Sequence, residues 1–178
     1  MVITTAITTV SRDCRSQNAD PSHNAKLLEC IILIGLPGAG KTSFSRRYFA
    51  TTHEHVSKDL RPHASGRDAQ QRRAIEQALA AGRSVVVDNT NATAADRAAI
   101  IAAARAGGAL PIGYFIDVTP RVAIARNAER SGRERVPNVA IFTVAKRLQR
   151  PSLIEGFDQL FKVQIAADRS FHVVELQT

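Results

Sequence analysis

The sequence contains no apolar stretch long enough to cross a membrane, and this absence excludes a large class of proteins. None of its apolar runs approaches the roughly 20 residues of a spanning helix. The first ten residues show neither the basic start nor the small-residue cleavage site of a secretory signal. We therefore expect a cytoplasmic protein with no membrane partner.

Cysteines and aromatic residues are also scarce. The two cysteines, Cys14 and Cys30, stand in no metal-binding spacing, so we expect reduced thiols and no zinc site. With no tryptophan and two tyrosines, the chain offers few rings on which bases could stack, which argues against extensive base stacking.

Acidic residues are in deficit, because 24 Lys and Arg stand against 16 Asp and Glu, a net charge of +8. Nineteen of the basic residues are arginine, whose planar guanidinium matches phosphate oxygens, whereas lysine acts more as a point charge. The composition therefore indicates partners that carry phosphate, such as nucleotides or nucleic acids, without choosing among them.

The 178 residues suffice for one domain with a full core. Residues 1–26, rich in Thr, Ser, Asn and Asp, predict a flexible N-terminal extension, which leaves 27–178 as the domain. Continuous apolar runs, typical of parallel strands covered on both faces, lie at 31–34, 55–57, 84–88, 112–117 and 161–166. Predicted helices alternate with them and cover 41–49, 67–81, 93–107, 120–137 and 138–149, the third with Thr93 as its N-cap and Asp96 three residues later. This order predicts an α/β fold with a five-stranded parallel sheet flanked by helices.

A phosphate-binding loop follows the first predicted strand. GLPGAGKT, from Gly35 to Thr42, fits G-x-x-x-x-G-K-[ST] in full and lies between a strand and a helix. Backbone N–H groups and the positive end of the helix surround a polyphosphate in such a loop, while Lys41 reaches the β- and γ-phosphates and Thr42 binds Mg²⁺. ATP is the expected nucleotide, since no guanine-reading N/T-K-x-D run follows. The nucleotide-binding residues are then Gly35, Pro37, Gly38, Ala39, Gly40, Lys41, Thr42 and Ser43, in a P-loop kinase fold.

Two carboxylates follow predicted strands, at the sheet edge where chemistry gathers in open α/β folds. Asp59 comes just after the run at 55–57, where it could accept a proton from an acceptor hydroxyl; the alternative is a turn cap. Asp88 ends the run at 84–88, the usual place of a carboxylate that holds Mg²⁺ directly or through water. We predict Thr42 and Asp88 as the metal ligands, and Lys41, Asp59 and Asp88 as catalytic residues.

Arginines concentrate in the helix predicted at 120–137, where Arg126, Arg130 and Arg133 would share one face. The segment from Arg121 to Arg150 holds seven Arg and one Lys against two Glu. We expect an arginine-bearing helical lid that closes Arg126 and Arg130 onto the triphosphate, with Arg130 catalytic. An ordinary solvated basic face is the alternative.

Five segments together resemble the kinase domain of the polynucleotide 5′-kinase family, including the domain fused to a 3′-phosphatase in animal enzymes. They are GLPGAGKTSF, HVSKDL, VVVDNTNATAADRA, ARNAERSGR and RPSLIEGF, and the similarity covers about residues 28–165. The resemblance implies that Asp59 is the general base, that Arg130 contacts the phosphates and that Arg126 lies nearer the nucleotide base. It also implies ATP and Mg²⁺ as cofactors and a 5′-OH end of DNA or RNA as acceptor. The acceptor-binding residues are then Asp59, Arg61, Asn89, Asn91 and Arg97.

The chain departs from the family around the predicted base. Lys58 replaces the usual arginine before Asp59, and Arg61 follows Asp59 by two residues where a viral enzyme has an arginine after three. A D-x-D-G-T phosphatase signature is missing, so we expect a kinase without phosphatase activity, with any phosphatase or ligase on separate chains. Two alternatives stay open. One is a P-loop kinase for a small hydroxyl compound, such as a sugar, nucleoside, antibiotic or nucleotide-sugar, and the other is a nucleotide-dependent ATPase switch.

Overall fold

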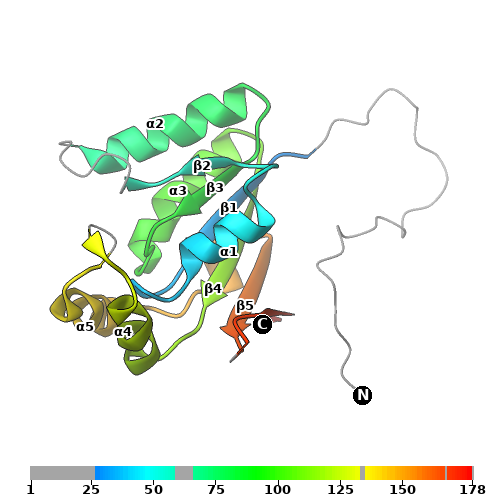
Figure 1. The fold of residues 1–178 in the computed structure, drawn as a ribbon. Coiled ribbons are helices and arrows are strands. Elements are labelled where there is room, and N and C mark those ends of the chain that lie inside the picture. Colours follow the sequence, from blue (N-terminus) through cyan, green and yellow to red (C-terminus); the bar gives the residue numbers. More distant parts are fainter. Residues whose placement is uncertain (1–26, 59–65, 133–134, 167, 178) are drawn as a thin grey trace, which may run out of the picture.

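The computed structural model describes residues 27–58, 66–132, 135–166 and 168–177, which form one sheet with helices on both faces (Figure 1). Its strands are β1 (Glu29–Ile34), β2 (Glu54–Val56), β3 (Val85–Asp88), β4 (Leu110–Ile116), β5 (Gln159–Ile165) and β6 (Phe171–Glu175). Across the sheet their order is β2-β3-β1-β4-β5-β6. The first five run parallel to their neighbours, which confirms the predicted five-stranded parallel sheet.

Strand β6 is an element that the sequence did not lead us to predict. It pairs antiparallel with β5, from Phe161 opposite Glu175 to Ile165 opposite Phe171. In the turn between them, the Asp168 carboxylate accepts hydrogen bonds from the backbone N–H (3.0 Å) and the hydroxyl (2.7 Å) of Ser170. As the last strand of the sheet, β6 is only half-buried and lacks the continuous apolar run of a central parallel strand.

Within the described residues, five α-helices and a short 3₁₀ helix surround the sheet. They are α1 (Lys41–Tyr48), α2 (Arg67–Ala80), α3 (Ala94–Ala106), α4 (Pro120–Ala128), α5 (Asn138–Arg147) and η3 (Leu153–Glu155). Helices α2 and α3 pack on one face of the sheet, while α1, α4 and α5 pack on the other (Figure 1). No helix in the described ranges is long and apolar enough to cross a bilayer.

The core explains why β1 is apolar at successive positions from Cys30 to Ile34. In β1, Cys30 and Ile32 face the α2–α3 layer, whereas Ile31 and Leu33 face the layer that contains α1. All four side chains are at most 1% exposed. Because both faces of the strand are covered, alternation of apolar and polar residues would bury polar groups without partners.

The start of α3 confirms the predicted cap at Thr93. Its hydroxyl accepts the N–H of Asp96 (3.1 Å), and the Asp96 carboxylate accepts the N–H of Thr93 (3.0 Å). This reciprocal pair satisfies two of the donors that a helix start leaves free. It also fixes the short segment 89–92 between β3 and α3, which adjoins the phosphate-binding loop.

The arginine-rich region is not the single helix predicted at 120–137, so the shared helical face for Arg126 and Arg130 is wrong. Helix α4 ends at Ala128 and α5 begins at Asn138. Gly132 adopts φ 57°, a left-handed conformation that interrupts a helix. The buried Asn127 amide donates to the Val136 carbonyl (2.7 Å) and accepts the Val136 N–H (3.0 Å), which closes the loop between the two helices. Arg133 lies outside the described residues.

Cys30, at the centre of the sheet, gives a test of this packing. Burial raises the pKa of its thiol from 9.0 to about 12. The unfolded chain therefore ionises first, and the stability due to this group should be complete below about pH 8.5 and fall as the pH rises toward 12.

In a Cys14→Ser variant at pH 8, we expect iodoacetamide to label native Cys30 only as fast as the protein unfolds. A urea-unfolded control should label at once, whereas equally fast labelling of the native protein would contradict the burial.

Candidate active site

The phosphate-binding loop, residues 35–40, joins the end of β1 to the start of α1. Gly38 has φ 79°, and a Cβ atom there would lie 2.5 Å from the backbone oxygen of Ala123 in α4. Glycine is therefore required both for the backbone conformation and for the close approach of α4. Gly35 donates its N–H to the Thr90 carbonyl (3.1 Å), which ties the loop to the segment after β3.

Lys41 is the first residue of α1, and its side chain extends into this loop; the residue is 8% exposed. Its ammonium group donates to the carbonyl oxygens of Gly35 (3.0 Å) and Leu36 (2.8 Å). The remaining predicted nucleotide-binding positions surround it: Pro37, Ala39 and Gly40 belong to the loop, and Thr42 and Ser43 to the first turn of α1. Lys41 thus holds a positive charge at the centre of a curved backbone, an arrangement suited to an anion.

Asp88, at the end of β3, faces the first turn of α1 and is 5% exposed. Burial acts to raise its pKa, but hydrogen bonds from His55 and Thr42 and the charge of Lys41 together hold the pKa below its usual range. The carboxylate is therefore ionised at neutral pH and sits beside the Thr42 hydroxyl. The structure brings together the two side chains that the sequence predicts as metal ligands.

His55 is a site residue that the sequence analysis missed. Its Nε2 lies 3.2 Å from the Asp88 carboxylate, across from β2 to β3. The parallel register places His55 beside Val86, two residues before Asp88, so both side chains point to the same face of the sheet. The pattern of the apolar run predicts strand β2, but only the pairing of β2 with β3 reveals this contact.

Asn89 connects three elements next to Asp88. Its amide oxygen accepts the backbone N–H of Lys58 (2.9 Å), and its amide nitrogen donates to the side-chain oxygen of Gln71 in α2 (2.7 Å). It therefore fixes the end of β2 to the end of β3 and to α2. This position is compatible with the predicted acceptor role, since Asn89 is only half-buried.

Asn91 and Arg97, in contrast, are not placed to contact an acceptor. Asn91 is 3% exposed, and its amide donates to the Leu33 carbonyl (2.7 Å) at the end of β1. Arg97 has no exposed surface; its guanidinium forms two hydrogen bonds with Glu155 (2.6 and 2.7 Å) and donates to three backbone carbonyls. These side chains hold the base of the site, and their predicted acceptor role is wrong because both are buried.

The two lid arginines stand on either side of the end of α4. Arg126, in the last turn of the helix, donates to the Ala39 carbonyl in the phosphate-binding loop (3.3 Å). Arg130 lies two residues beyond the helix, in a turn where its N–H donates to the Asn127 carbonyl (3.2 Å). Arg126 therefore adjoins the loop. Asp59 and Arg61 lie outside the described residues.

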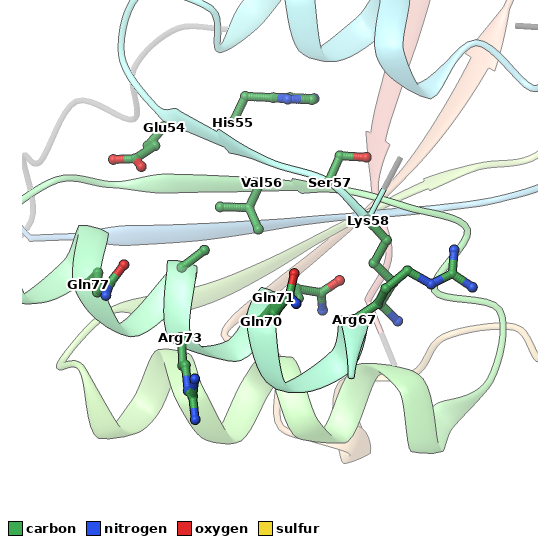
Figure 2. Close-up of a pocket in the computed structure, with 11 residues that line it drawn as sticks. Glu54, His55, Val56, Ser57, Lys58, Arg67, Gln70, Gln71, Arg73 and Gln77 are labelled. Carbon is green, nitrogen blue, oxygen red and sulfur yellow. The ribbon is translucent and has the colours of Figure 1, made fainter. Parts of the chain in front are cut away.

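A groove opens beside these residues, between β2 and α2 (Figure 2). It has a volume of about 500 Å³, within the size range of small-molecule sites. His55, which contacts Asp88, and Lys58, which contacts Asn89, both line it. The groove therefore reaches the residues next to the phosphate-binding loop.

The fold and the loop define a P-loop nucleotide-binding domain of the kinase type. The chain belongs to the AAA_33 family of AAA domains, which it matches over residues 30–151. It is 28% identical over 156 residues to the bifunctional polynucleotide phosphatase/kinase of Schizosaccharomyces pombe, a match that covers 84% of this chain and 37% of that protein. The chain thus spans little more than a third of the length of this relative. The resemblance to polynucleotide kinases inferred from the sequence is confirmed.

Solved structures support the same fold. A fungal RNA kinase superimposes with a TM-score of 0.58 at 15% identity, covering 81% of this chain and 79% of that one. A gluconokinase from Sinorhizobium meliloti 1021 superimposes with a TM-score of 0.56 at 20% identity, covering 78% and 83%. At these identities the likeness shows a P-loop kinase fold and does not distinguish between acceptors.

Proposed function

We propose that this chain is an ATP-dependent kinase that transfers the γ-phosphoryl group of ATP to the 5′-hydroxyl end of DNA or RNA. The Schizosaccharomyces pombe relative supports the polynucleotide acceptor. The observation that carries the proposal is the hydrogen bond from the Lys58 N–H to Asn89 (2.9 Å). It holds Lys58, the residue before Asp59, against the residue after Asp88 at the phosphate-binding edge of the sheet, which supports the choice of Asp59 as the base.

Lys41 and the arginines bind the triphosphate in this proposal. The Lys41 ammonium exchanges the carbonyls of Gly35 and Leu36 for oxygens of the β- and γ-phosphates. Arg126, already at the loop, and Arg130, in the following turn, add positive charge where negative charge develops during transfer. The backbone N–H groups of the loop orient the phosphates without requiring further side chains.

Asp59 acts as the general base in this proposal. Its carboxylate accepts the proton of the 5′-hydroxyl as the oxygen of that hydroxyl forms a bond to the γ-phosphorus. The bond from the γ-phosphorus to the bridging oxygen breaks on the opposite side, so that ADP leaves with that electron pair. The products are ADP and a 5′-phosphorylated end.

Thr42 and Asp88 fit a magnesium ion. Both offer oxygen ligands, and the Asp88 carboxylate is ionised. Mg²⁺ in kinases is usually held by one or two protein oxygens together with substrate phosphates and water. Within the described ranges, no cluster of three His, Cys, Asp or Glu side chains could hold a metal by itself. When bound, the ion would neutralise phosphate charge, with Thr42 and Asp88 as its protein ligands and His55 orienting Asp88.

The chain carries the kinase activity alone in this proposal. The Schizosaccharomyces pombe relative is bifunctional, and this chain matches little more than a third of it. The chain lacks the D-x-D-G-T phosphatase signature.

An acceptor screen with γ-labelled ATP tests the proposal. The panel contains 5′-OH DNA and RNA oligonucleotides, the same oligonucleotides with a 5′-phosphate, nucleosides and simple sugars. We expect label only on the 5′-OH oligonucleotides. Transfer to a sugar or nucleoside instead would establish the small-molecule kinase, and ATP hydrolysis unaffected by every hydroxyl compound would establish the ATPase switch.

A further inference from the structure

The groove between β2 and α2 extends away from the phosphate-binding loop along the free edge of the sheet. Lys58 and Arg67 lie at one end, and Glu54 and Gln77 lie at the other (Figure 2). The stretch of α2 from Arg67 to Gln77 is about 15 Å long at 1.5 Å per helical residue. The groove therefore offers more length than a terminal hydroxyl group alone would need.

The lining of the groove is polar and positively charged. Among the residues that the structure describes, Lys58, Arg67 and Arg73 line it together with one acidic residue, Glu54. Glu54 pairs with Arg83 (3.0 Å) and Lys58 pairs with Asp68 (2.6 Å), so counting these partners leaves the net charge unchanged. The excess of two positive charges comes from α2 and favours a polyanion.

Amide side chains provide the rest of the lining. Gln70, Gln71 and Gln77 follow one side of α2, and each amide carries both donors and acceptors. In Figure 2 the side chains of Gln70 and Gln71 lie in the middle of the groove, below Val56. No phenylalanine, tyrosine or tryptophan is among the lining residues. Recognition in this groove would therefore rely on hydrogen bonds and charge, not on stacking.

Two contacts join the groove to the phosphoryl-transfer residues. His55 lies on the β2 side of the groove, and its side chain points away from α2 (Figure 2), where its Nε2 lies 3.2 Å from the Asp88 carboxylate. Gln71 accepts the Asn89 amide (2.7 Å), and Asn89 holds the backbone of Lys58 (2.9 Å). A molecule in the groove thus lies against the elements that position Asp88 and the segment leading to Asp59.

We propose that this groove binds the nucleotides that follow the 5′-terminal one in a single-stranded DNA or RNA acceptor. Arg67 and Lys58 contact the phosphates next to the reacting end, because the guanidinium fork matches phosphate oxygens. Gln70 and Gln77 hydrogen-bond to base edges or sugars farther along the strand. The assignment deepens the proposed function and rests on it. An extended peptide is a poorer occupant, since β2 is only three residues long and offers little edge for strand addition.

The test compares two neighbouring arginines of α2. Arg67 lines the groove, whereas Arg72 is exposed on another side of the helix and pairs with Glu76 (3.7 Å). We expect Arg67→Gln to raise KM for a 5′-OH decanucleotide by about three- to tenfold, the effect of one charged hydrogen bond. Arg72→Gln should change it by less than about twofold. For both variants, kcat and KM for ATP should match the wild type.

Acceptor length and salt add readouts that a structural effect would not move. With a nucleoside 3′-monophosphate as acceptor, which keeps the phosphate next to the reacting end, KM should be raised by Arg67→Gln about as much as with the decanucleotide and should be unchanged in Arg72→Gln. For a decanucleotide bound without ATP, the slope of log affinity against log salt should become about 0.7 less steep in Arg67→Gln, as for one lost phosphate contact. Arg67→Glu should change KM for the oligonucleotide and the salt dependence of its binding more than Arg67→Gln does. Arg72→Glu should not have these effects.

The outcomes separate the groove from the proposed function. If the wild type phosphorylates oligonucleotides but Arg67 and Arg72 variants behave alike, the groove assignment is overturned and the polynucleotide kinase stands. If the wild type phosphorylates no oligonucleotide, the proposed function fails; salt-dependent oligonucleotide binding that needs Arg67 but not Arg72 would still support the groove as a nucleic-acid site. If all four variants bind the oligonucleotide as tightly as the wild type, the groove assignment is overturned, whether or not the wild type phosphorylates oligonucleotides.

Discussion

Replacing Asp59 with asparagine is expected to lower kcat for a 5′-OH oligonucleotide by about 10² to 10⁴, the range for loss of a general base. Asparagine keeps the shape of the side chain but cannot accept the proton of the hydroxyl. KM for ATP should change little, because Lys41 and the loop that carries it bind the nucleotide in this proposal. The measurement is steady-state transfer of labelled phosphate, with thermal unfolding to show that the variant is folded.

Asp68→Asn is the matched control for this prediction. Asp68 is exposed, and its pKa is lowered by a hydrogen bond and an ion pair with Lys58, so the variant removes a nearby negative charge without touching the proposed base. Its kcat should stay within about twofold of the wild type. A kcat for Asp59→Asn as high as that of Asp68→Asn would show that Asp59 is not the base.

Arg97→Met is expected to lower the free energy of unfolding by about 3 kcal/mol, the low end of the range for breaking a buried ion pair. Arg97 is fully buried, and Glu155, 17% exposed, accepts two of its hydrogen bonds. Without the guanidinium, the carbonyls of Asn91 and Gln149 lose its N–H groups, and the Glu155 carboxylate and the Ala92 carbonyl each keep a backbone N–H but lose the charged donor. Urea denaturation followed by circular dichroism measures the loss.

Two further variants show whether the loss comes from the buried charge. Arg97→Met combined with Glu155→Met should be more stable than Arg97→Met alone, because no carboxylate then remains without its charged partner. Arg105→Met, on the same helix, removes a half-exposed arginine that pairs with Asp158 (2.9 Å), and should cost less than about 1 kcal/mol. Equal losses in Arg97→Met and Arg105→Met would show that burial of the ion pair contributes nothing.

Local signals in the sequence were sufficient for most of the fold. The apolar runs predict the five parallel strands, most clearly β1 and β3, in which both faces are covered. Thr93 with Asp96 predicts the start of α3 because a capping box is a contact within four residues. The phosphate-binding loop is equally local. Each of these features depends on residues that are neighbours in the chain.

The errors concern contacts between distant residues. Arg97 follows the D-N-T-N motif and so resembled a surface arginine, but its partner Glu155 is 58 residues away. The contact between His55 and Asp88 depends on the pairing of β2 with β3. Ser131 and Gly132 are a local signal for the end of α4, but the regular spacing of the arginines favoured a longer helix. The hydrogen bonds between Asn127 and Val136 are again a contact that is not local.

The paired hydrogen bonds between the Asn127 side chain and the Val136 backbone have a consequence for engineering and for divergence within the family. They hold together the two ends of the connection between α4 and α5. The residues between these ends can therefore change in length or composition while both helices keep their packing on the sheet. Exchanging that connection as a unit is then expected to leave the packing of α4 and α5 unchanged.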